Sequence, residues 1–109
     1  MINGVVGKGM TVVNENLSFS LTNADIALPI VTNVTLCNTT PNSGTYTFSI
    51  MDSSETEVTS QDQIFIDSDI TANETIDLGN YILSPDEIIV INANISGIAV
   101  RVTGVQQPN

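Results

Sequence analysis

Alternation of apolar and polar residues is the feature that most constrains the fold of this chain. It is clearest in residues 17–21 (LSFSL), 45–50 (TYTFSI) and 98–103 (IAVRVT). A period of two places successive side chains on opposite faces of a β-strand, so each segment would direct one set into a core and the other into water. No window shows apolar residues at helical spacing, so the pattern predicts an all-β fold.

Turn-forming residues separate these segments and others rich in Ile, Val, Leu and Phe. Their spacing predicts seven or eight short strands in a single domain of 109 residues. We therefore expect an antiparallel β-sandwich, either jelly-roll or immunoglobulin-like. Residues 88–91 are apolar on both faces, which predicts a central or doubly covered strand. The remaining apolar segments are 30–37, 63–67 and 74–78, and the turn signals lie at 38–44, 52–57, 79–80, 84–86 and 96–97.

The first thirteen residues do not follow the alternation, because three glycines interrupt their apolar residues. We predict that residues 1–13 form a mobile arm or an edge strand, and that residues 14–109 form the sandwich. The apolar members of this segment are expected to cover a neighbouring subunit. Deletion of residues 1–10 would then abolish assembly and leave the fold intact. The predicted contact residues are Met1, Ile2, Val5, Val6 and Met10.

Charge excludes two classes of partner. The chain has twelve acidic residues against Lys8 and Arg101, and its formal net charge is −10. Nucleic acids and anionic membranes are bound through Lys and Arg, so neither is an expected partner. No signal peptide or membrane-spanning apolar segment is apparent, which predicts synthesis in a cytoplasm.

The residues offer no catalytic constellation. Histidine is absent, so no His-based triad or dyad can form. The segment GVVGKG at residues 4–9 lacks the order of a phosphate-binding loop. The carboxylates of Asp67 and Asp69 could offer oxygen ligands to Ca²⁺, but a solvated turn is the preferred interpretation. Cys37 is expected to be a buried, inert thiol. We predict no enzyme activity, no cofactor and no metal site.

Five segments follow one another in a familiar order: VTNVTLCN (31–38), GTYTFSI (44–50), ITANETI (70–76), ILSPDEI (82–88) and IAVRVTGV (98–105). This order resembles small β-sandwich virion proteins of tailed bacteriophages. The matching positions are turn and core positions: Leu83 and Ile88 would belong to the core, and Asn73 would form a turn. No functional site transfers with the resemblance, which departs from the family pattern at residues 85–87 and 105–106.

The resemblance implies a structural part of a phage particle, made in the host bacterial cytoplasm and located in the virion. The favoured function is non-enzymatic binding and stabilisation of the capsid surface, as a homo-oligomer in the form of a trimer or ring. The expected partners are other copies of the chain and virion proteins such as the major capsid or tail protein. One alternative is a tail, neck or fibre component. Another is a carbohydrate- or receptor-binding module with its site on loops 38–44 and 52–62, expected at one end of the sandwich.

Overall fold

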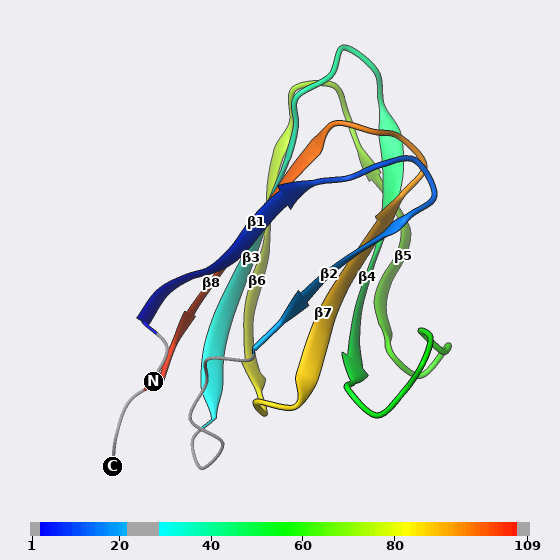
Figure 1. Ribbon diagram of the computed structural model, residues 1–109. Helices are drawn as coiled ribbons and strands as arrows, with labels where there is room; N and C mark the ends of the chain where they lie inside the picture. Colours follow the sequence, from blue (N-terminus) through cyan, green and yellow to red (C-terminus); the bar gives the residue numbers. More distant parts are fainter. Residues whose placement is uncertain (1–2, 22–28, 107–109) are drawn as a thin grey trace.

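The computed structural model describes residues 3–21 and 29–106. The described residues form strands and connecting turns, with no helix among them (Figure 1). The strands are β1 (Asn3–Met10), β2 (Asn16–Ser20), β3 (Ile30–Asn38), β4 (Gly44–Asp52), β5 (Gln63–Ile70), β6 (Thr75–Leu83), β7 (Glu87–Ala93) and β8 (Ile98–Val105).

The eight strands form two antiparallel sheets of four, packed face to face (Figure 1). One sheet has the order β1-β8-β3-β6 and the other β2-β7-β4-β5. The first strand pairs with the last, the second with the seventh, the third with the sixth and the fourth with the fifth. The chain is thus one long antiparallel hairpin rolled into two layers, which is the arrangement of a jelly roll. The predicted β-sandwich is confirmed, and its order is that of a jelly roll.

The core between the sheets consists of the apolar residues that the alternation predicts to face inward. In β8, Ile98, Val100 and Val102 are buried, while Arg101 between them is exposed. Phe48 of β4 is fully buried. Its ring centroid lies 5.2 Å from that of Tyr81 and 6.2 Å from that of Phe65. These three rings join β4, β6 and β5 at one side of the sandwich.

The prediction that residues 88–91 form a central strand is confirmed, since β7 lies between β2 and β4. Val90 lies on the outer face of this sheet and is nevertheless buried, and it lines a depression together with Glu57 and Val58 of the β4–β5 loop. Ile88 also lies on that outer face, opposite Ser20 and Met51, and is half-buried. The expectation that Ile88 belongs to the core is therefore wrong, because the pleat directs Ile89 inward instead.

The glycine-rich start of the chain is an edge strand of the sandwich. β1 pairs with β8 along its length, and a bulge at Val6 turns that side chain onto the core. Gly7 faces the other sheet so closely that a Cβ there would lie 2.5 Å from Cδ1 of Phe19. Glycine at this position therefore allows β1 to pack over β2, and the interruption of the alternation has a steric cause.

Deleting residues 1–10 should destabilise the fold, contrary to the expectation from sequence. The deletion uncovers Phe19, removes the contact of Val6 with the core and exposes the edge of β8. Burial of one apolar side chain is worth about 2 kcal/mol, so the free energy of unfolding should fall by at least that amount. Urea denaturation measures it. A full-length Val5→Ser, Met10→Ser variant should stay within about 0.5 kcal/mol of the wild type, because both side chains are exposed. An unchanged midpoint for the deletion would contradict this account of β1.

Alkaline pH should weaken the fold through Tyr46. Burial raises the pKa of this phenol above its ordinary value, so the folded state favours the neutral form. The stabilisation is complete below about pH 10, the unfolded value, and is lost as the pH rises through the folded pKa. Tyr46→Phe should remove this part of the alkaline loss. Urea denaturation of both proteins between neutral and alkaline pH measures the difference, and parallel pH profiles would contradict the prediction.

Candidate functional site

The outer face of the β1-β8-β3-β6 sheet is the candidate functional surface. Strand pairing aligns its outward side chains in rows that cross the sheet. We call this surface the outer face and name three of its rows by their chemistry. The apolar row is Val105, Val31 and Ile82; the charged row is Lys8, Arg101, Thr35 and Asp77; and the end row is Met10, Ala99, Cys37 and Thr75.

The apolar row places three large aliphatic side chains in water. Val105 and Val31 are exposed, and Ile82 is 75% exposed. They come from β8, β3 and β6, so they are side by side in space although distant in sequence. Val5, in the next row on β1, is exposed as well. Single exposed aliphatic residues are ordinary, whereas a contiguous group on a flat sheet indicates a contact surface.

The charged row holds both basic side chains of the whole chain. Lys8 of β1 and Arg101 of β8 are directly paired positions, and both are exposed. Neither forms an ion pair or a hydrogen bond through its side chain within the described residues. Like charges placed opposite each other on neighbouring strands destabilise a sheet. No described side chain forms an ion pair that would offset this repulsion.

Asp77 ends the charged row but does not neutralise it. Thr35 of β3 separates it from Arg101, and two strand spacings amount to about 10 Å. Oδ1 of Asp77 instead accepts hydrogen bonds from Nδ2 of Asn33, at 2.9 Å, and from the backbone N–H of Gly79, at 2.9 Å. This carboxylate thus stabilises the irregular part of the β3–β6 pairing, between Asn33 and Thr35. The side-chain donors of Lys8 and Arg101 stay unpaired within the described residues.

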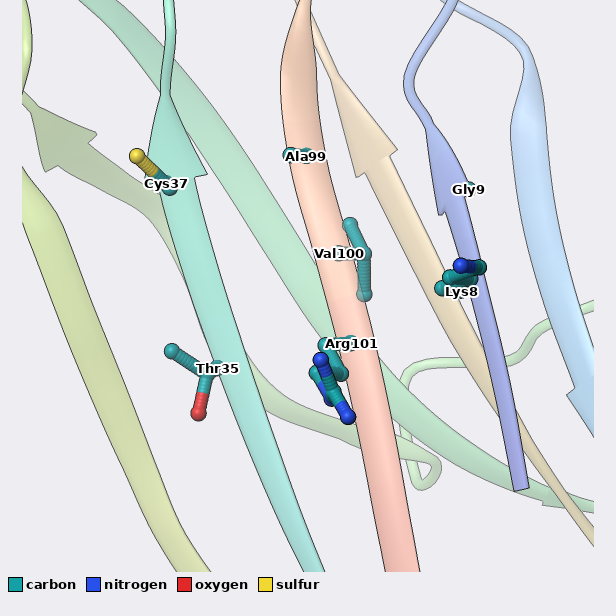
Figure 2. Close-up of a pocket in the computed structure, with 7 residues that line it drawn as sticks. All are labelled: Lys8, Gly9, Thr35, Cys37, Ala99, Val100 and Arg101. Carbon is teal, nitrogen blue, oxygen red and sulfur yellow. The ribbon is translucent and has the colours of Figure 1, made fainter. Parts of the chain in front are cut away.

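An open depression lies between the charged row and the end row (Figure 2). In Figure 2, Lys8 and Arg101 lie side by side on neighbouring strands, with Thr35 and Cys37 on the next strand. The lining is mainly apolar apart from the two cationic head groups. The lining residues are Lys8, Gly9, Thr35, Cys37, Ala99, Val100 and Arg101.

Cys37 differs from its expected state. It is a half-buried free thiol on the outer face rather than a buried core residue. The reason is the pleat: Leu36 and Asn38 on either side of it point inward and are fully buried. The apolar neighbours of Cys37 that suggested burial, such as Leu36, therefore point to the opposite face of β3.

The predicted contact residues divide between two environments. Val5 and Met10 are exposed on the outer face, and the structure brings them together with the apolar row and the end row. Val6 turns toward the core. Met1 and Ile2 lie outside the described residues. The sequence analysis missed Val31, Ile82 and Val105, whose position in the outward phase of their strands was a usable signal.

The outer face of the other sheet carries Ile88 and Val90, described above, and beside them a polar area. Nδ2 of Asn92 donates to Oδ1 of Asn16 at 2.8 Å, and Ser49 and Thr47 continue the same surface. The β4–β5 loop covers part of it. Loops 38–44 and 52–62 lie at opposite ends of β4, so the expectation that they form one binding end is wrong. Neither loop carries an aromatic residue that could stack on a sugar.

Carboxylates in the β4–β5 loop have shifted pKa values with local causes. The backbone N–H of Ser54 lowers the pKa of Asp52, and the backbone N–H of Thr59 lowers that of Asp62. A side-chain hydrogen bond to Asp62 raises the pKa of Glu55. All three carboxyl groups are in solvent, so the shifts reflect the turns of the loop. The absence of enzyme activity stays a prediction.

Asp67 and Asp69 lie in β5 rather than in a turn. Both are exposed, and Asp67 has a positive φ of 46° where the pairing of β5 with β4 is irregular. Within residues 3–21 and 29–106, no three His, Cys, Asp or Glu side chains gather as a metal site would require. The same part of the chain contains no helix long and apolar enough to cross a membrane.

Comparison with known proteins gives no relative. No protein-family model, curated protein sequence or solved structure matches the chain significantly.

The two cations should repel each other measurably. In a double-mutant cycle with Lys8→Met and Arg101→Met, the coupling should be unfavourable to folding by about 0.2–1 kcal/mol at low salt. Salt at about 1 M should remove it, because screening then acts within about 3 Å. Urea denaturation of the four proteins, at concentrations where they are monomeric, measures the coupling. A favourable coupling would show that the side chains share a partner within the domain.

Proposed function

We propose that this protein is a non-enzymatic structural component of a bacteriophage particle that assembles as a homo-oligomer and binds and stabilises the capsid surface. The observation that carries the proposal is the apolar row on the outer face, Val105, Val31 and Ile82. The sequence resemblance to phage virion proteins is the reason for proposing a phage particle, and the apolar row is the surface proposed to mediate assembly.

The apolar row supports assembly by a simple energetic argument. Covering an exposed Val or Ile side chain contributes about 25 cal/mol for each Å² of apolar surface removed from water. The row is flat and spans three strands, and Val5 is exposed in the next row on β1. A flat apolar surface of this kind fits another protein surface better than it fits a small ligand, which binds in a concave site.

The jelly-roll arrangement is compatible with this function but does not single it out. Viral capsid proteins share it with lectins and cupins, so the fold contributes an analogy only. A place on the tail, neck or fibre would use the same outer face. We favour the capsid surface, where many copies of a small domain can each bury one apolar face.

The oligomeric state tests the proposal. Sedimentation velocity should give a mass that is a multiple of 11.6 kDa for the wild type. Val31→Ser, Ile82→Ser should shift it toward the monomer, since the variant removes two of the three aliphatic side chains of the row. Val12→Ser, Val13→Ser is the matched control, because these valines are also exposed but lie in the β1–β2 connection.

Co-sedimentation with phage heads tests the second part. The wild type should sediment with particles, and the Val31→Ser, Ile82→Ser variant should not. A wild type that stays monomeric at high concentration and does not sediment with particles would overturn the proposed function. Equal loss of assembly in the control variant would show that the apolar row is not the surface involved.

A further inference from the structure

Charge restricts how copies of this chain can meet. Every copy has a formal net charge of −10, and its only basic side chains are Lys8 and Arg101. A favourable ion pair between side chains of two copies must therefore use one of these residues. Both lie in one row of the outer face, without a partner in the described part of their own chain. The surface of the second copy must bring carboxylates to that row.

β5 carries the matching chemistry on another side of the molecule. It is an edge strand of the other sheet, where Ile64, Phe65 and Ile66 are all exposed and Ile66 is 59% exposed. Asp67 and Asp69 follow directly and are exposed too. Apolar residues beside two carboxylates on β5 thus complement apolar residues beside two cations on the outer face.

The spacing of the charges is compatible on the two surfaces. Positions two apart along an extended strand are separated by about 7 Å, which is an upper value for Asp67 and Asp69 because Asp67 has a left-handed conformation. Directly paired positions on neighbouring antiparallel strands are separated by about 5 Å. Long Lys and Arg side chains bridge the difference. Glu15, near the exposed Val12 and Val13, is another acidic residue next to exposed aliphatic side chains, but it offers one carboxylate instead of two.

The edge of β5 is poorly suited to extending its own sheet into a neighbour. Its pairing with β4 shifts register twice, and Asp67 has a left-handed backbone conformation. Bulges and charges on an edge strand oppose strand addition. Contact through side chains against a flat face is therefore favoured over a continuous sheet between copies.

We propose that the outer face of one copy binds the β5 edge of a second copy, with Lys8 and Arg101 facing Asp67 and Asp69. This inference rests on the proposed homo-oligomer and names its interface. Because the two surfaces are different parts of the molecule, the contact is head-to-tail and not two-fold symmetric. Head-to-tail contacts close into rings or continue as filaments.

Isosteric neutralisation is the first test. Asp67→Asn, Asp69→Asn removes both carboxylates and keeps a residue type that tolerates the positive φ at position 67. Glu15→Gln, Glu57→Gln is the matched control with the same change in net charge. Sedimentation at several concentrations should give a dissociation constant raised at least about tenfold for the β5 variant and nearly unchanged for the control. The difference should shrink at high salt.

Charge exchange is the second test, and circular dichroism confirms that each variant is folded. Lys8→Glu, Arg101→Glu should abolish assembly, and adding Asp67→Lys, Asp69→Lys to the same chain should restore it. The control instead adds Glu15→Lys, Glu57→Lys, which returns the net charge to the wild-type value of −10 in the same way. Only the first combination should assemble.

The two proposals fail in different ways. A wild type that assembles while the β5 variants behave like their controls would overturn this interface and leave the proposed function standing. Assembly of both charge-exchange combinations would also overturn it, because net charge and not a specific pairing would then govern association. A wild type that never assembles would overturn the homo-oligomer itself.

Discussion

Burial of apolar side chains between the two sheets is the interaction on which the rest of this structure depends. Most strands supply an apolar face, β1 adds Val6, and rolling one long hairpin brings these residues together. A core formed in this way is complete without the outward residues. Large aliphatic side chains on an outward phase, such as Val31 and Ile82, therefore have no function in the core. Their exposure links the fold to an intermolecular contact.

Electrostatics adds a second constraint, which acts on the contact rather than on the fold. Copies of a strongly acidic chain repel one another, so association is favoured by particle components of opposite charge or by contacts that use the two cations. Pairing β1 with β8 places both cations beside each other in an apolar surface. The same surface thus offers hydrophobic contact and the only source of attraction between the side-chain charges of two copies.

Sequence reasoning succeeded where the local pattern is regular and failed where geometry between sheets matters. The inward phase of residues 98–102 followed from periodicity, and the central position of β7 followed from the continuous apolar run at residues 88–91. For the glycine-rich start the sequence left a mobile arm and an edge strand open, because the clash that requires Gly7 involves Phe19 of the other sheet. Cys37 was assigned to the core from its neighbours, although the pleat directs it outward.

The sequence alone determined the fold class and the direction of most side chains, because alternation is a local property of each strand. Tertiary structure decided which strands lie side by side, because pairing depends on backbone hydrogen bonds between distant segments and on the shared core. Lys8 and Arg101 come from opposite ends of the chain, and only the closure of β1 on β8 makes them neighbours. The apolar row likewise exists only once β8, β3 and β6 are aligned in register.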